Sequence, residues 1–276
     1  MMTSAKRILL ASGAVMMVIA AVGASAQPSS SIPDFSSGGA AWQQGNDGRL
    51  EGVPGFPGPM RDDPKYPFVP NGRGAQPTFR IADLTNPNLK QWAKDIMKKD
   101  NDEVIAGKIA YTPGSSCMPH GVPEINMVGG PHFFVQAPDK VTIIMEGDHQ
   151  FRQVYLNVPH TANPKPSWYG ESVGHYEGDT LVIDTIGQTA KTFVDNYRTP
   201  HTEKLHVVER WRLVEGGQQL EVHFTVDDPD TFNQPWQATR RFRKVQAPLM
   251  EEACAENNLN FGLFDYHIPQ ADKPDF

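Results

Sequence analysis

The stretch Glu171–Thr185, which reads ESVGHYEGDTLVIDT, decides the fold of this chain. Apolar and polar residues alternate on both sides of Glu177-Gly178, and a two-residue loop that contains glycine is a strong signal of a β-hairpin. The sequence therefore predicts two antiparallel strands that are joined by a tight turn at these two residues.

This turn also fixes which side chains share a face of the hairpin. It pairs His175 with Thr180 and Glu171 with Asp184. Because residues that pair across two strands lie on the same face, two carboxylates and an imidazole are expected together. Such a group suits proton transfer if it faces a pocket, and it is an ordinary solvated surface if it faces water. The sequence alone leaves open which face is the interior.

The chain beyond Gly107 carries a succession of similar patterns. Runs of β-branched and aromatic residues alternate with turn signals, and no helical period intervenes, which favours an antiparallel sheet curled into a β-barrel. The predicted strands are Val141–Glu146, Phe151–Asn157, Gly170–Tyr176, Thr180–Thr185, Leu205–Val214, Gln219–Val226 and Trp236–Val245.

The hairpin around Gly216-Gly217 gives the clearest separation of faces. Its turn pairs Arg212 with Glu221 and leaves one face almost wholly apolar. The exception on that face is Glu209, and the next strand carries a similar lone charge, Arg240. An isolated buried charge is very costly, so we expect these two side chains to pair inside the barrel. The alternative is a bulge that turns Glu209 out to solvent.

The first residues read as a signal peptide. Lys6 and Arg7 precede an apolar run, and cleavage is expected after Ala26, which predicts an exported protein of the bacterial periplasm with no membrane insertion after cleavage. Residues 27–78 are rich in Pro and Gly and form an extended lead-in or strap. Residues 79–276 are expected to form a single β-barrel domain.

One helix is predicted ahead of the barrel. Asn86 is its expected N-cap, Pro87 its first residue, and it should end near Lys98-Lys99-Asp100. The apolar stripe of this helix comprises Leu89, Trp92, Ala93, Ile96 and Met97.

Two cysteines and an acidic balance constrain the class of protein. Cys117 and Cys254 are expected to form a disulfide, because an even number of cysteines in an exported chain favours pairing. The net charge is −7, and removal of Lys6 and Arg7 with the leader lowers it to −9. Binding to nucleic acid is therefore not expected.

Histidines concentrate in the predicted sheet, and their neutral form titrates near working pH, which suits general acid or base catalysis. His201, Glu203 and His206 could supply metal ligands, but the spacing of known metal motifs is absent, so no metal and no cofactor are predicted. Nucleophile-elbow, phosphate-loop and dinucleotide motifs are absent as well.

Several segments resemble a large, mostly uncharacterised family of exported proteins found in sphingomonads, other proteobacteria and acidobacteria. The resemblance covers about 117–257 and implies a lipocalin-like barrel with a ligand cavity. Its bacterial hosts often degrade aromatic and terpenoid compounds, which suggests such substrates by association. The matching segments are Val154–Leu156 (VYL), Pro166–His175 (PSWYGESVGH), Glu177–Thr185 (EGDTLVIDT), Pro200–Glu203 (PHTE), Val208–Arg210 (VER), Asp228-Pro229 ahead of Pro235-Trp236, Cys117–Pro119 and Cys254–Asn257.

These observations predict an enzyme that acts on a small hydrophobic or aromatic molecule, which includes lignin-derived compounds, by cofactor-independent acid–base chemistry of the lyase, dehydratase or isomerase type. His175 or His201 would remove a proton, and Glu171 or Asp184 would orient the imidazole. Glu209 is a further catalytic candidate. The expected substrate-binding residues are Tyr155, Trp168, Arg240, Trp236 and His149.

A carrier that binds a hydrophobic ligand without turning it over is the alternative function. A homo-oligomer is compatible with either reading.

Overall fold

The computed structural model describes residues 32–36, 38–45, 49–68, 80–108, 111–127 and 129–254. The predicted signal peptide, residues 1–26, lies outside the described residues. Within these ranges no helix has the length and apolar character needed to cross a membrane.

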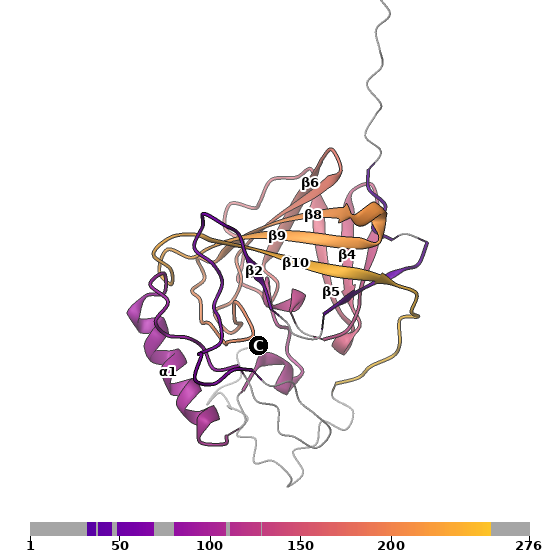
Figure 1. Ribbon diagram of the computed structural model, residues 1–276. Coiled ribbons are helices and arrows are strands. Elements are labelled where there is room, and N and C mark those ends of the chain that lie inside the picture. Colours follow the sequence, from indigo (N-terminus) through magenta and orange to yellow (C-terminus); the bar gives the residue numbers. More distant parts are fainter. Residues whose placement is uncertain are drawn as a thin grey trace, which may run out of the picture. The chain divides into compact units, whose positions relative to one another are not determined.

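The described residues form a closed, mainly β barrel (Figure 1). Neighbouring strands follow the order β1-β3-β4-β5-β6-β7-β8-β9-β10, and β1 pairs with β10 to close the sheet. The short strand β2 pairs with another part of β10. The barrel prediction is thus confirmed. The strands are β1 Ala41–Gln44, β2 Glu51–Gly52, β3 His132–Gln136, β4 Lys140–Met145, β5 Gln150–Leu156, β6 Glu171–Glu177, β7 Thr180–Ile186, β8 His206–Val214, β9 Gln219–Asp227 and β10 Trp236–Val245.

One strand pair departs from the predicted antiparallel sheet. β5 and β6 run parallel and pair only from Val154–Ser172 to Leu156–Gly174. A parallel pair needs a crossover connection, and residues 157–170 supply it without a helix. The expectation of a purely antiparallel sheet is therefore wrong at this pair, because the Pro-containing stretch between the two strands forms a crossover and not a hairpin turn.

The β6–β7 hairpin is present, but its turn lies one residue later than predicted. The turn residues are Gly178 and Asp179, and Gly178 has a φ of 62°, a conformation that favours glycine. The register moves by two residues, so that His175 pairs with Val182. Because the side-chain period of a strand is also two, every residue keeps its predicted face.

The face of this hairpin that points into the barrel is the one opposite Glu171, His175 and Asp184. Leu181 and Ile183 are fully buried in the barrel core. The three candidate catalytic residues therefore project from the outer surface, and the question that the sequence left open is answered against an interior site.

The β8–β9 hairpin follows the predicted register, with Arg212 paired to Glu221. Its inner face is buried, and Glu209 on that face is fully buried as well. The bulge that would have turned Glu209 out to solvent is absent from this strand. The interior is filled by an aromatic cluster in which the Phe134 and Trp211 rings lie 5.4 Å apart and the Trp211 and Phe242 rings 5.6 Å apart.

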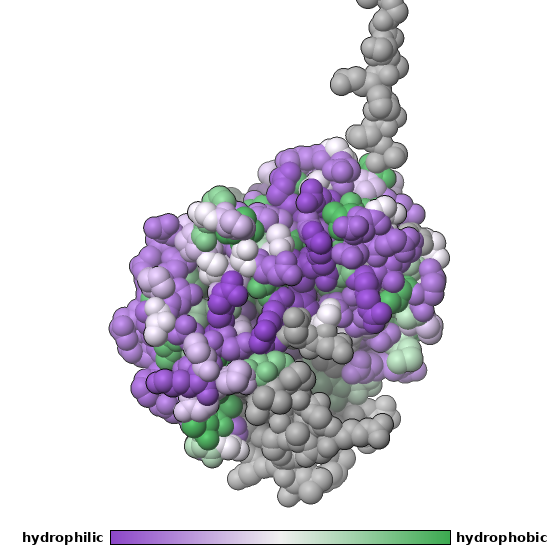
Figure 2. Space-filling model, in the orientation of Figure 1, coloured by the Kyte–Doolittle hydropathy of each residue, from purple (hydrophilic) through white to green (hydrophobic). Residues whose placement is uncertain are grey.

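The outer face of β8, β9 and β10 is polar. Arg212, Arg241 and Glu221 form a bridged set there, with Glu221 accepting hydrogen bonds from both guanidinium groups. Figure 2 shows that hydrophilic residues dominate the face of the molecule drawn there. This distribution is what the alternation of apolar and polar residues along the strands predicts.

Helix α1, Gln91–Ile105, begins and ends several residues later than expected, with Lys90 as its N-cap. Its buried face comprises Ala93, Met97 and Asn101, whereas Trp92 and Ile96 are exposed. Asn101 explains the extension, because its side-chain amide bonds both the backbone N–H and the carbonyl of Ala82. Short 3-10 helices occupy Pro113–Ser116 (η1), Glu124–Asn126 (η2), Gly147–His149 (η3) and Glu215–Gly217 (η4).

The Pro- and Gly-rich lead-in contributes directly to the barrel. Within it, β1 closes the sheet, and Phe35 and Trp42 are fully buried. A lone Trp in a four-residue strand leaves no periodic pattern, which is why the sequence predicted only a strap. The barrel therefore draws on residues ahead of position 79.

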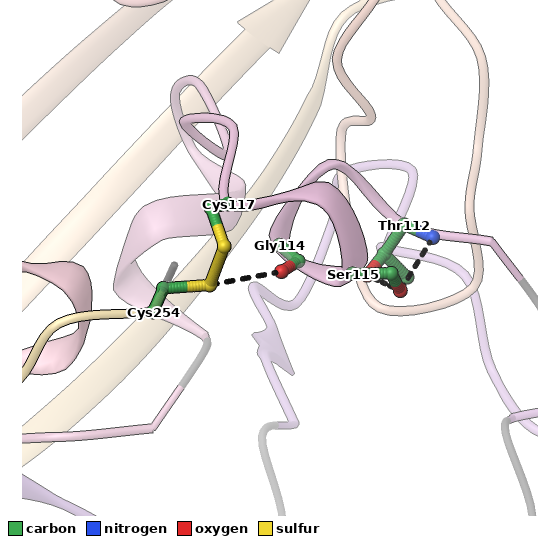
Figure 3. The surroundings of a disulfide bond; sticks show 5 residues. All are labelled: Thr112, Gly114, Ser115, Cys117 and Cys254. Carbon is green, nitrogen blue, oxygen red and sulfur yellow. Dashed lines mark hydrogen bonds between the residues drawn. A yellow bond between two sulfur atoms is a disulfide. The ribbon is translucent and has the colours of Figure 1, made fainter. Parts of the chain in front are cut away.

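The predicted disulfide between Cys117 and Cys254 is present (Figure 3). It joins the residue that follows η1 to the stretch after β10, with a Cα–Cα distance of 5.5 Å. The Cys254 Sγ lies 3.8 Å from the carbonyl oxygen of Gly114. The bridge fastens the end of the described chain to the connection between α1 and β3.

Candidate functional site

A surface cleft opens where β5 and β6 separate. The two strands pair only from Val154 onward, so the first half of β5 diverges from the crossover 157–170. The cleft has a volume of about 650 Å³, which suits a small organic ligand. It is lined by Phe151, Arg152, Gln153, Tyr155, Thr161, Asn163, Pro164, Lys165, Tyr169, Gly170, Glu171 and Ser172.

Aromatic side chains form much of the wall of this cleft. Phe151 and Tyr155 project outward from β5 and are about half exposed. Tyr169 comes from the crossover, and its hydroxyl donates to Gln150 at the start of β5. Tyr155, a predicted substrate-binding residue, is therefore at the cleft, and Phe151 and Tyr169 were not predicted.

Glu171 places a carboxylate in the same cleft. It begins β6, and its Oε1 lies 2.9 Å from His160 Nδ1 and accepts a 2.8 Å hydrogen bond from the backbone N–H of Thr161. These contacts hold the crossover against the sheet. Glu171 was predicted as a catalytic residue, but the imidazole beside it belongs to His160 and not to His175.

His160 also joins Glu171 to a second carboxylate. Its Nε2 lies 3.0 Å from Asp184 Oδ1 on β7, and the same oxygen lies 2.9 Å from His206 Nε2 on β8. The predicted pair Glu171 and Asp184 is thus brought together through an imidazole. We call these four residues, Glu171, His160, Asp184 and His206, the outer His–carboxylate cluster.

The hydrogen bonds of the cluster set its charge state. Burial raises the pKa of Glu171, but the backbone N–H of Thr161 and the His160 side chain outweigh this effect and leave the pKa below its ordinary value. The pKa of Asp184 is lowered in the same way, because the bonds from His206 and His160 outweigh burial. The bond to Asp184 raises the pKa of His206, against the effect of burial.

The cluster suits proton transfer better than metal binding. The two ring nitrogens of His160 point to different carboxylates, so the four side chains do not converge on one point. Among the residues that the structure describes, no group of three or more His, Cys, Asp or Glu side chains could hold a metal ion. An ionised carboxylate in a cleft with a hydrogen-bonded imidazole behind it is a general-base arrangement.

The predicted interior pair, Glu209 with Arg240, is wrong. Glu209 Oε2 lies 2.6 Å from Arg152 Nη2, and its Oε1 accepts a 3.2 Å bond from Asn126. Arg240 is buried as expected, but it donates to Gln44 and to the carbonyl of Arg49. The sequence could not give this pairing, because β5 and β8 are not neighbours in the barrel.

His175 and His201 lie away from the cleft. His175 is exposed and bonds Glu177, at 2.9 Å. His201 is buried in the β7–β8 connection, where its Nδ1 lies 2.8 Å from the Thr202 carbonyl and its Nε2 2.7 Å from the Thr192 hydroxyl. Burial lowers the pKa of His201, which favours the neutral ring. The structure places neither imidazole beside Glu171 or Asp184.

The remaining predicted binding residues do not line this cleft. Trp236 is buried and packs its ring 6.2 Å from that of Phe232. His149 Nε2 accepts a 3.0 Å hydrogen bond from the backbone N–H of Glu252 and lies 2.8 Å from the carbonyl oxygen of Met250, so His149 contacts the stretch after β10. Trp168 is half-buried in the crossover and is not among the lining residues.

Sequence reasoning missed a second group of buried ionisable residues. Glu124, Asp195 and Arg198 are almost fully shielded from water. Burial raises the pKa of both carboxyl groups and lowers the pKa of Arg198. The Asp195 carboxylate is held by the Thr199 hydroxyl at 2.9 Å. These residues do not line the cleft.

The residues that the sequence missed at the cleft have weak signals. His160 lies in a Pro-containing stretch. Arg152 occupies an inward position of β5, and only the alternation of the run FRQVYL indicates this position. The sequence matches no protein-family model, and comparisons with curated proteins and with solved structures find no significant match. The resemblance to an exported bacterial family therefore stays a prediction.

Proposed function

We propose that this chain is an exported enzyme that binds a small aromatic or hydrophobic molecule and acts on it by acid–base chemistry. The reaction is of the lyase, dehydratase or isomerase type and uses the chain's own side chains without a cofactor. One observation supports it most directly: the Glu171 carboxylate lines an aromatic cleft and is bonded to His160, which reaches Asp184. The site thus lies on the outer wall of the barrel.

In this proposal Glu171 is the general base. Its lowered pKa keeps the carboxylate ionised at neutral pH, so it can accept a proton from a bound substrate. His160 and the Thr161 N–H fix the carboxylate in the cleft, and Asp184 fixes the far side of the imidazole. The proton that Glu171 takes is returned to another substrate atom in an isomerisation, or to the departing group in an elimination.

The periplasm is the proposed location of this activity. The leader 1–26 carries the pattern of a signal peptide. The Cys117–Cys254 disulfide is compatible with export, because such bonds persist in oxidising compartments.

The test compares Glu171→Gln with a matched control, Glu177→Gln, on the same outer face of β6. The purified proteins are incubated with hydroxylated aromatic compounds, including lignin-derived dimers, and products are followed by mass spectrometry. We expect Glu171→Gln to lower turnover at least about 100-fold, the usual contribution of a general base. Equal turnover by wild type and Glu171→Gln, or an equal loss in both variants, overturns the proposal.

A carrier function is the second candidate, and one observation favours it. The same hydrogen bonds that lower the pKa of Glu171 make it a weaker base, which a binding protein tolerates and an enzyme must overcome. Recovery of a bound aromatic compound without chemical change, with the same affinity in Glu171→Gln and in wild type, identifies the carrier.

A further inference from the structure

A second groove, of about 690 Å³, shares no residue with the β5–β6 cleft. It is lined by three segments that are distant in the sequence, 52–59, 83–88 and 233–234, together with Arg61. We propose that this groove binds a neutral oligosaccharide. The proposal concerns a different part of the molecule from the proposed enzyme site and does not depend on it.

Backbone hydrogen bonds fix loop 52–59 to the rest of the structure. The Gln237 N–H on β10 donates to the carbonyl of Pro57 at 3.0 Å. Just beyond this loop, the Arg61 carbonyl accepts a 2.9 Å bond from the Asp83 N–H. The loop is thus tied to β10 at one side and to segment 83–88 at the other.

The other two segments of the groove are tied to each other. The Asn88 side-chain amide donates to the Gln234 carbonyl at 2.9 Å, and its Oδ1 accepts a 2.9 Å bond from the Gln234 N–H. The backbone N–H of Asn233 also donates to the Asn88 carbonyl, at 2.8 Å. All three segments are therefore held in place by the protein itself, and a preformed site spares a ligand the cost of ordering its walls.

Three polar side chains of the groove keep hydrogen-bonding capacity for a ligand. The Arg61 guanidinium and the Gln234 amide have no hydrogen bond or ion pair within the part of the chain that the structure describes. Asp83 Oδ1 accepts bonds from the backbone N–H and the hydroxyl of Thr85, at 2.9 and 2.7 Å, so its second oxygen stays available. The groove thus offers a group that only donates, a carboxylate that accepts, and an amide that does both.

This set of side chains favours a neutral ligand with many hydroxyl groups. An anionic group that approaches Arg61 also meets the carboxylate of Asp83, and a cationic group that approaches Asp83 also meets Arg61. A hydroxyl group both donates and accepts, so neighbouring hydroxyls can satisfy Arg61, Asp83 and Gln234 together. A purely apolar ligand would leave these three side chains without partners.

The apolar part of the lining comes from loop 52–59 and suits the other side of a sugar ring. Phe56 is 52% exposed, and the rings of Pro54, Pro57 and Pro59 lie along the same loop. A sugar ring has an apolar C–H face and an edge of hydroxyls, so the Phe56 ring can cover the face while the polar side chains bind the edge. The volume of the groove suits a short oligosaccharide.

The first test measures binding of neutral trisaccharides to the purified protein by isothermal titration calorimetry. The probes are cellotriose, maltotriose and N,N′,N″-triacetylchitotriose. We expect at least one of them to bind with a Kd of about 1 mM or lower. Absence of binding by all three overturns the proposal. Deca-proline tests the other class of ligand that a groove with an exposed aromatic ring can take. Binding of this peptide in place of the sugars overturns the proposal as well.

The second test assigns the binding to the groove. We expect Phe56→Ala to weaken it about fivefold and Arg61→Met about tenfold, as loss of ring contact and of charged donors implies. Tyr66→Ala is the matched control for the aromatic ring, because Tyr66 is 43% exposed on the same lead-in but does not line the groove. Arg243→Met on β10 is the control for the cation.

Both control variants should bind the trisaccharide as wild type does. Equal affinities of Phe56→Ala and Tyr66→Ala, with those of Arg61→Met and Arg243→Met also equal, overturn the assignment to this groove. Glu171→Gln should also keep wild-type affinity, and a loss there shows that the sugar occupies the β5–β6 cleft instead. Since the two sites share no residue, failure of sugar binding leaves the proposed acid–base function to its own test.

Discussion

Glu209 and Arg152 meet at 2.6 Å inside the barrel, where both side chains are shielded from water. The sequence does not predict this ion pair, because β5 and β8 are not neighbours in the strand order. The surrounding bonds to Asn126, Ser172 and Thr185 keep both charges in place. A buried pair of this kind is costly to break at one end, because the remaining charge stays in a medium that solvates it poorly.

This relationship predicts strong coupling between the two residues. Arg152→Met alone should lower the free energy of unfolding by about 3–5 kcal/mol, because it leaves Glu209 uncompensated. Arg152→Met/Glu209→Gln should be less destabilised than the sum of the single variants by at least about 1 kcal/mol. Urea denaturation of the four proteins measures the difference.

The exposed pair Arg210–Glu177, also 2.6 Å apart, supplies the control for this cycle. Ion pairs in contact with water couple by less than about 1 kcal/mol. Coupling of equal size in the buried and the exposed cycle contradicts the prediction.

Because His206 and Asp184 are hydrogen-bonded, we expect the free energy of unfolding to depend on pH, with this pair stabilising less at both low and high pH. The pKa of His206 is raised, so its contribution is complete below the unfolded value of 6.5 and is lost as pH rises through the folded pKa. The pKa of Asp184 is lowered, so its contribution is complete above the unfolded value of 3.8 and is lost as pH falls through the folded pKa. The pair therefore stabilises most between about pH 4 and 6.5.

The measurement compares wild type with His206→Asn by urea denaturation from pH 5 to 9. The two free energies of unfolding should differ most near pH 5.5 and approach each other above the pKa of the folded histidine. His175→Asn on the same outer surface serves as the control. A difference that stays constant across this range argues against the pair as its source.

The sequence predicted the elements whose pattern is local and repetitive. Alternation along β8 and β9 fixed both their register and the inward position of Glu209, because one strand face is apolar and the turn is short. The two-residue shift in the β6–β7 turn left the faces unchanged, since it equals the side-chain period. The disulfide could be predicted because the chain has only two cysteines.

The parts that the sequence missed depend on contacts between distant residues. The parallel pairing of β5 and β6 creates the cleft, and nothing in either strand distinguishes it from an antiparallel neighbour. His160 becomes important only because the crossover lays it between Glu171 and Asp184. Of the candidate residues, Glu171, Asp184 and Tyr155 fall at or beside the cleft, whereas His175 and His201 lie elsewhere.

A buried histidine predicts a second dependence on pH. His132 is fully buried beside Phe242, with the rings 5.1 Å apart, and burial together with the charge of Arg240 lowers its pKa to about 4. Because the unfolded state binds the proton more tightly, stability is complete above the unfolded value of 6.5 and falls as pH decreases towards 4. The loss over this range is about 3 kcal/mol.

His132→Phe keeps an aromatic ring at this position and removes the titrating group. Its free energy of unfolding should decline less than that of wild type between pH 7 and 4, by about 3 kcal/mol. The exposed His175→Phe is the control and should follow the wild-type curve. Parallel curves for wild type and His132→Phe show that His132 does not carry this dependence.

The Cys117–Cys254 bridge predicts a stability that depends on redox conditions. It closes a segment with a sequence separation of 137 residues, and closing a loop of this length restricts the unfolded chain. Cys117→Ser/Cys254→Ser should lower the free energy of unfolding by about 2–4 kcal/mol, the usual size of such an effect. Reductant should destabilise wild type to the same degree and leave the variant unchanged, as urea denaturation with and without dithiothreitol will show. A wild-type protein that unfolds at the same urea concentration with and without reductant, although thiol titration shows that both cysteines are free after reduction, contradicts a stabilising role for the bridge.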